Sequence, residues 1–144
     1  MTDALRAAYL ATRILVTNHG REIDLDEVPE GGLADAVAPL EPPICIVTAW
    51  NPMSVPQPLD VNLAANLLLQ AALEARPLPW LPAEGRSPDG SWREPGFAID
   101  HISEADAREI GHWWAQVAVF YLTEGEVAIL DSAGAFRDSR ARSQ

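Results

Sequence analysis

The amino-acid sequence predicts a single α+β domain, with two main helices packed on a mixed or antiparallel sheet and a hairpin at its C-terminal end. The chain has 144 residues, of which 48% are hydrophobic and 22% charged, a balance typical of one globular domain with its own core. Stretches with helical and strand periodicity alternate irregularly, and two strand patterns follow each other directly near the end. We expect residues 1–130 to form the domain and residues 131–144 to be a frayed, polar tail.

The first forty residues predict a helix, a strand and a long loop. Thr2 can cap a short helix, residues 12–17 alternate in the manner of a strand, and residues 18–20 have turn chemistry. Residues 21–43 are acidic and interrupted by proline and glycine. They therefore predict a long excursion that carries one short helix near residues 33–38.

A buried strand and the longest helix are expected next. Residues 44–47 form a continuous apolar run, mostly β-branched, which is typical of a central strand covered on both faces. The chain must turn at Pro52, because proline cannot donate to a sheet. Asp60 is the expected N-cap of a helix over residues 61–75.

A proline-rich stretch follows that helix. Residues 77–96 contain five prolines and three glycines, together with Trp80 and Trp92, which a solvated linker would not need. We expect an ordered loop or an irregular edge here, followed by a short strand over residues 97–99.

The last elements are a helix and a hairpin. Ser103, with Asp106 three positions later, resembles a capping box and predicts a helix to about residue 114. Residues 117–122 and 127–130 have strand patterns separated by a short polar turn, which predicts the terminal hairpin.

Composition excludes several classes of protein. The formal net charge is -11, and all ten basic residues are arginine, so the surface should repel nucleic acid and anionic membranes. The acids are interleaved with arginine, which argues against a nucleic-acid mimic. The single cysteine, Cys45, cannot form an intramolecular disulfide and should lie in the core. Without a signal-peptide pattern or a membrane-length apolar stretch, we expect a cytoplasmic protein.

The common catalytic and metal-binding motifs are absent from the sequence. His19, His101 and His112 have no metal-site spacing, and no metalloprotease, G-x-S-x-G, P-loop or G-x-G-x-x-G pattern occurs. We therefore expect no metal site and no cofactor.

Three asparagines are candidates for ligand binding. Asn51 follows the buried strand, where the end of a strand can border a ligand crevice. Asn62 and Asn66 share one face of the expected helix, although asparagine is not favoured inside helices. Asn51 either contacts a ligand or forms an Asx turn that satisfies nearby backbone amides before Pro52. Asn62 and Asn66 either contact a ligand or cap a neighbouring loop.

Glu94 is the most interesting carboxylate. In a strand, its side chain would share one face with Trp92 and residue 96. If that face is buried, Glu94 either pairs with an arginine, with Arg13 or Arg86 as candidates, or has a raised pKa suited to acid–base chemistry. Alternatively, Glu94 binds backbone amides and holds the proline-rich loop in place.

The polar motifs together resemble a known family. They are Thr48-Ala49-Trp50-Asn51-Pro52, then Asn62 and Asn66, Gly85, Pro88-Asp89-Gly90-x-Trp92-x-Glu94-x-x-Phe97 and Gln116-x-Ala118. In this joint spacing the chain resembles the domain of unknown function family 3293, a family of small uncharacterised bacterial proteins, over roughly residues 9–130. The residues before Gln116 are longer and bulkier than that family's usual small-aromatic-Gly-Gln pattern. The resemblance implies a site location and no established activity.

Two kinds of function are compatible with the sequence. The first is a non-catalytic binding or protein-interaction module that holds a protein or small-molecule ligand. It would use the motif at residues 48–52 and the motif at residues 88–94. The alternative is a small metal-independent enzyme with Glu94 as general acid or base. Whether the protein is an enzyme is left open. The expected ligand-binding residues are Asn51, Asn62, Asn66, Trp92, Glu94 and Gln116.

Overall fold

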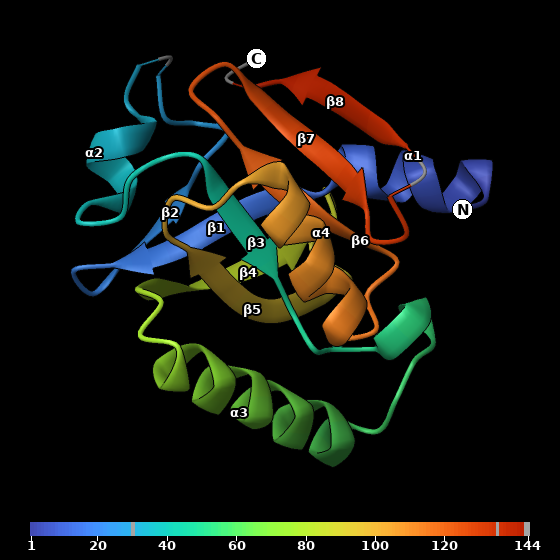
Figure 1. Ribbon diagram of the computed structural model, residues 1–144. Helices are drawn as coiled ribbons and strands as arrows, with labels where there is room; N and C mark the ends of the chain where they lie inside the picture. The colour runs from blue at the N-terminus through green and yellow to red at the C-terminus, as the bar shows by residue number, and fades with distance from the viewer. Residues whose placement is uncertain (30, 135, 143–144) are drawn as a thin grey trace.

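An antiparallel sheet of eight strands, curled on itself, carries four α-helices in the computed structural model, which describes residues 1–29, 31–134 and 136–142 (Figure 1). The strands are β1 (Arg13–Asn18), β2 (Arg21–Asp24), β3 (Ile44–Val47), β4 (Trp80–Arg86), β5 (Arg93–Ile99), β6 (Ala118–Leu122), β7 (Glu126–Asp131) and β8 (Arg137–Ala141). The helices are α1 (Asp3–Ala11), α2 (Leu33–Val37), α3 (Leu59–Ala75) and α4 (Glu104–Trp113), with a 3-10 turn, η1 (Pro52–Ser54), before α3. The strand order is β2-β1-β4-β5-β3-β6-β7-β8. This architecture confirms the predicted α+β class.

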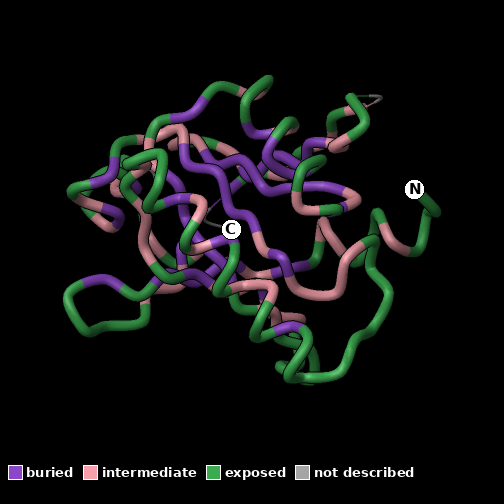
Figure 2. Tube along the Cα trace, turned by 60° about the horizontal axis from the view of Figure 1, so that its bottom comes forward, coloured by how far each residue is buried: buried purple, intermediate pink, exposed green. Residues whose placement is uncertain are grey.

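Each face of the sheet has its own hydrophobic core. On one face, Ile14, Ile44 and Phe120 belong to a cluster that α1 and α2 cover. On the other face, a second cluster includes Leu69 of α3 and Ile110 of α4. Figure 2 shows the buried residues gathered in the middle of the molecule. The central strand β3 is buried on both faces, as its continuous apolar run predicted, and Cys45 lies inside it.

Helix caps were predicted with mixed success. The Thr2 hydroxyl accepts a hydrogen bond from the Leu5 N–H, and the Ser103 hydroxyl accepts one from the Asp106 N–H, so both caps are confirmed. The prediction that Asp60 caps α3 was wrong. The helix begins at Leu59, with the extended Pro58 in the cap position, and Asp60 lies in the first turn, where the helix dipole favours an acid.

The proline-rich stretch forms a hairpin rather than a loop. β4 and β5 pair over their whole lengths, from Trp80 with Ile99 to Arg86 with Arg93. Proline is tolerated because each one lies where its strand lacks a second neighbour: the β1 pairing ends before Pro82, and the β3 pairing ends before Pro95. Strand β2 was not predicted either, because its residues were expected to lie in the long loop. It pairs with β1 across a turn with left-handed backbone.

Part of the stretch that we expected to be a frayed tail forms a strand, β8, over Arg137–Ala141. The predicted hairpin of β6 and β7 is confirmed, but β8 then extends it. The β8 edge lies near the opposite edge of the sheet, because Arg140 pairs with Asp26 and the Arg142 guanidinium donates to the Leu25 carbonyl. Arginine side chains therefore join the two edges of the curled sheet where no strand pairing does. Residues 143–144 lie outside the described part of the chain.

Helix α3 is apolar on two sides. Its inner side, with Leu69 and Leu73, packs on the sheet. Its outer face consists of large apolar side chains that are about half exposed or more, namely Leu59, Val61, Leu63, Leu67 and Leu68. No helix of the described residues is long and apolar enough to cross a membrane.

Candidate functional site

Two asparagines of α3 hold the segment that follows β3. The Asn66 side-chain oxygen accepts a hydrogen bond from the Ala49 N–H at 2.9 Å, and its amide group donates to the Pro95 carbonyl at 2.9 Å. The Asn62 oxygen accepts from the Asn51 N–H at 2.8 Å, and its amide group donates to the Asn51 side-chain oxygen at 2.8 Å. Asn62 and Asn66 therefore position a loop, which was one of the two roles left open for them.

The loop held in this way has an unusual backbone. Asn51, Met53 and Ser54 all have positive φ angles, of 45°, 56° and 62°. This left-handed conformation is costly for Met and Ser, and it persists only where the surroundings fix it. Besides the asparagines of α3, the Met53 N–H donates to the Ala115 carbonyl at 2.6 Å. The result is a strained loop with a defined position beside the β4–β5 hairpin.

Glu94 lies near the start of β5, opposite Gly85 of β4. Because Gly85 has no side chain, nothing from the paired position covers the Glu94 carboxylate. Within the described residues this carboxylate accepts no hydrogen bond and forms no ion pair. The expected arginine partners are wrong: Arg13 pairs with Asp24 and Glu27, whereas Arg86 pairs with Glu22 and Glu84. The alternative role, binding backbone amides of the loop, is not observed either.

A second glycine brings β5 close to the strained loop. A Cβ atom on Gly96 would lie 2.5 Å from the Val47 carbonyl oxygen, so only glycine allows this approach. The Thr48 hydroxyl then reaches the Pro95 carbonyl at 2.6 Å. This contact fixes the segment after β3 against the strand that carries Glu94.

Two adjoining cavities meet at Glu94. The outer one, of about 330 Å³, is lined by Leu5, Ala8, Tyr9, Thr12, Asn51, Ser54, Pro56, Trp92 and Glu94. The inner one, of about 40 Å³, shares Tyr9, Trp92 and Glu94 and also reaches Gln116 and Gly85. We call the two together the Glu94 cavity. Trp92, which lies just before β5, and Glu94 line the same cavity.

Burial tunes the two ionisable groups of this cavity. Desolvation raises the pKa of Glu94 from its ordinary 4.5 to about 7. Desolvation also raises the pKa of Tyr9, and the negative charge of Glu94 adds to that rise, while hydrogen bonding to the Ser54 side chain opposes it. Glu94 can therefore change its protonation state near neutral pH.

The structure brings together four of the six residues expected to bind a ligand. Asn51, Trp92, Glu94 and Gln116 line the Glu94 cavity. Gln116 is buried, and its amide group donates to the Trp50 and Trp114 carbonyls. Asn62 and Asn66 do not line the cavity.

Sequence reasoning missed Tyr9, Thr12 and Ser54, which come from elements distant from Glu94 in the sequence. Tyr9 lies on the apolar stripe of α1, where its hydroxyl was the only available signal, because a buried tyrosine hydroxyl needs a polar partner. Nothing in the sequence around Thr12 or Ser54 indicates the site.

The effect of Glu94→Gln on the free energy of unfolding is expected to depend on pH. The substitution should be more favourable to stability at about pH 8 than at about pH 5. Because the pKa is higher in the folded state, the folded protein binds the proton more tightly than the unfolded chain, and wild-type stability falls as the pH rises from 4.5 to about 7. The neutral Gln lacks this dependence. Urea unfolding of both proteins at several pH values measures the difference.

Asp89→Asn is the matched control from the same hairpin. Hydrogen bonds from the Ser91 backbone N–H, the Ser91 hydroxyl and the Ser87 hydroxyl lower the pKa of Asp89 to about 2. The cost of this substitution should therefore be the same at about pH 5 and about pH 8. A Glu94→Gln difference that does not change with pH would contradict a raised Glu94 pKa.

The described residues contain no group of three or more His, Cys, Asp and Glu side chains that could hold a metal ion. The Glu94 cavity offers instead one carboxylate, one buried amide and several hydroxyl groups, between aromatic rings. These groups can hold a small molecule by hydrogen bonds and can exchange a proton with it.

The fold and the cavity define a single-domain α+β protein with an unpaired carboxylate enclosed between a β-hairpin, a strained loop and the N-terminal helix. Comparison with known families assigns the chain to one particular family. It belongs to the family described as "Protein of unknown function (DUF3293)", whose model matches residues 47–119, just over half of the chain. This match confirms the family resemblance that the polar motifs of the sequence indicated. The match includes Asn51, Glu94 and Gln116, whereas Tyr9 lies outside it. No curated protein and no solved structure matches the sequence.

Proposed function

We propose that the protein binds a small molecule in the Glu94 cavity, with the Glu94 carboxylate bonding to a donor group of that molecule. The observation that carries the proposal is that this carboxylate, half-buried and facing two cavities, has no hydrogen-bond or ion-pair partner among the described residues. A desolvated carboxylate without a donor is unfavourable. A ligand with a hydroxyl, amide or ammonium group supplies the missing donor.

The dimensions and lining of the cavity support a small ligand. Its outer part, at about 330 Å³, is at the lower end of the volumes of ligand pockets, which run from about 300 to 1,000 Å³. The Tyr9 and Trp92 rings offer apolar walls, and the side chains of Asn51 and Ser54 offer polar contacts. The ligand should therefore combine an apolar body with at least one donor group.

The two tryptophans of the hairpin favour a small molecule over a protein partner. Trp80 is half-buried and packs edge-on against Phe97, with ring centroids 5.0 Å apart. Trp92 is partly exposed but lines the Glu94 cavity. Neither ring is presented as a free anchor for a protein surface.

The test is a ligand-observed NMR screen with a fragment library of small amines, alcohols and amides. We expect fragments that bind the wild-type protein and lose at least tenfold in affinity with Glu94→Gln, since a hydrogen bond to a charged group contributes about 1.5–3 kcal/mol. Asp89→Asn, on the same hairpin but outside the cavity, should bind them like the wild type. If no fragment depends on Glu94, the proposal fails.

A second candidate function is acid–base catalysis by Glu94. The observation in its favour is the raised pKa of about 7, which gives both protonation states near neutral pH, as a general acid or base requires. In that case some Glu94-dependent fragments would be converted during the NMR measurement, and Glu94→Gln would slow the conversion by about 10²–10⁴-fold. If the fragments bind to the protein but are not converted, the result supports ligand binding and contradicts catalysis.

A further inference from the structure

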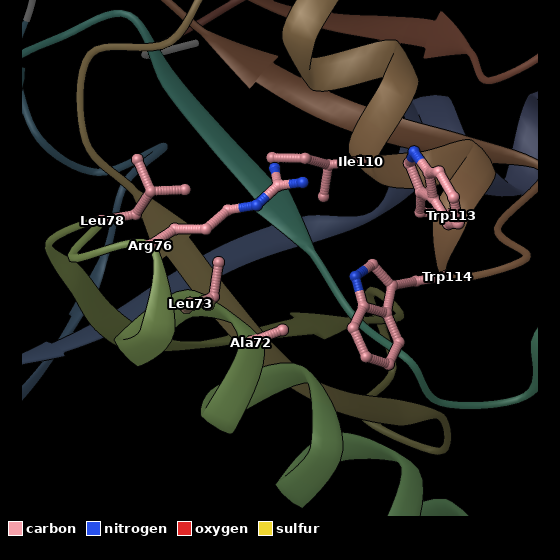
Figure 3. A pocket seen from close by; sticks show the side chains of 7 residues that line it. All are labelled: Ala72, Leu73, Arg76, Leu78, Ile110, Trp113 and Trp114. Carbon is pink, nitrogen blue, oxygen red and sulfur yellow. The ribbon is translucent and has the colours of Figure 1, made fainter.

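A second pocket lies between α3 and α4, away from Glu94. Ala72, Leu73, Arg76, Leu78, Ile110, Trp113 and Trp114 line it, and its volume is about 230 Å³. We call it the α3–α4 groove. It shares no lining residue with the Glu94 cavity. Figure 3 shows the Arg76 side chain extending from the end of α3 toward α4, with the Trp114 ring on the other side of the groove.

Arg76 differs from most arginines of this protein. Eight of the ten arginines donate hydrogen bonds to carboxylates or backbone carbonyls, namely Arg6, Arg13, Arg86, Arg93, Arg108, Arg137, Arg140 and Arg142. Among the described residues, Arg76 and Arg21 have no such bond. Of these two arginines, Arg76 lines the α3–α4 groove. Arg76 is exposed, so its guanidinium group is open to solvent and accessible to a ligand in the groove.

The polar groups of the groove are donors only. Its lining contains no Asp or Glu, and its other polar atoms on side chains are the indole nitrogens of Trp113 and Trp114, which also lack a described acceptor. Trp113 is 70% exposed, so its ring is accessible from solvent. An apolar cleft with one cation and two indole N–H groups is complementary to an anion attached to an apolar body.

Neighbouring acids limit the charge of that anion. Arg76 also borders a depression that contains Asp100, Asp106 and Glu109, none of which forms an ion pair with it. These carboxylates repel negative charge, and a doubly charged anion more strongly than a singly charged one. A carboxylate with one charge therefore fits better than a phosphate with two.

We propose that the α3–α4 groove binds a small monocarboxylic acid with an alkyl or aryl body. Its carboxylate accepts the paired hydrogen bonds that a guanidinium group offers, in this case that of Arg76. Its apolar body lies between Leu78, Ile110 and the ring of Trp114. The site does not depend on the function proposed for Glu94.

The experiment uses phenylacetate and hexanoate as probes, with phenylacetamide and hexanamide as uncharged analogues and phenyl phosphate as the doubly charged one. Binding is followed on the full chain by the indole N–H signals in ¹H–¹⁵N spectra, assigned with Trp113→Phe and Trp114→Phe. We expect both carboxylates to shift the Trp113 and Trp114 signals, and the amides and the phosphate to bind at least tenfold more weakly.

Arg76→Gln should weaken carboxylate binding at least tenfold, whereas the matched variant Arg21→Gln, which removes the other free arginine, should leave it unchanged. Glu94→Gln should also leave it unchanged, which separates this site from the Glu94 cavity. The inference is overturned if the amides bind as well as the acids, if Arg76→Gln has no effect, or if neither carboxylate shifts the two signals.

Discussion

Arg142→Ala is expected to lower the free energy of unfolding by about 3–5 kcal/mol, the cost of breaking a buried charged network. The Arg142 side chain is fully buried. Its guanidinium group donates to the carbonyls of Leu25, Val28, Pro29 and Glu124 at 2.8–3.3 Å. Truncation removes the shared donor of several carbonyl groups and separates the two edges of the curled sheet. Urea unfolding followed by circular dichroism measures the loss.

Arg21→Ala is the matched control for this experiment, because Arg21 is exposed and has no bond among the described residues. It should change stability by no more than about 0.5 kcal/mol. A loss below about 1 kcal/mol for Arg142→Ala would mean that the C-terminal strand does not hold the sheet edges together.

Asn62→Ala is expected to cost about 2–4 kcal/mol and also to abolish ligand binding at Glu94. Asn62 is only 2% exposed, and its amide exchanges two hydrogen bonds with Asn51 and donates a third to the Gln57 carbonyl at 3.3 Å. Without these bonds, the left-handed backbone at Met53 and Ser54 loses a large part of the contacts that offset its cost, and the bond from the Met53 N–H to the Ala115 carbonyl remains. The loop should then leave the rim of the Glu94 cavity.

Gln70→Ala on the same helix is the comparison for Asn62→Ala. Among the described residues, the Gln70 side chain forms one hydrogen bond, to Glu74 at 3.1 Å, so its loss should cost little and leave binding intact. Unfolding in urea gives the stability difference, and the NMR screen gives the binding. If Asn62→Ala loses stability but keeps fragment binding, the loop does not form part of the ligand site.

The fold could be predicted where the signal is local. The caps at Thr2 and Ser103 and the buried strand at residues 44–47 depend on neighbouring residues alone, and the structure confirms them. The hairpin of β4 and β5 was hidden because Pro82 and Pro95 look like strand breakers. Whether a proline is tolerated depends on which strands lie beside it, and a single sequence does not contain that information.

The last strand was missed for a related reason. Residues 137–141 are polar and charged, like a mobile tail, but β8 is an edge strand whose arginines have carboxylate partners far away in the sequence. Arg140 pairs with Asp26, across more than a hundred residues. Charge composition alone predicts a solvated segment here, and the tertiary pairing overrides it.

Some residues that line the Glu94 cavity could be named from the sequence, but others could not. Glu94, Trp92, Asn51 and Gln116 were recognisable as polar or aromatic residues in motifs, and the structure places them around one cavity. Tyr9 comes from a helix more than eighty residues away in the chain, and only the curled sheet brings it there. The absence of an arginine partner for Glu94 could not be foreseen either, because it depends on where every other carboxylate lies.

The outer face of α3 exposes large apolar side chains to neighbouring molecules in concentrated solution. Near neutral pH, the charge of -11 makes copies of the molecule repel one another and opposes contact between the exposed leucines. Toward the isoelectric point, near pH 4.5, this repulsion disappears, and we expect the apolar faces to favour association. High salt screens the same repulsion. We therefore expect the carboxylates to supply the colloidal stability of the protein, which should be greatest in dilute salt above neutral pH.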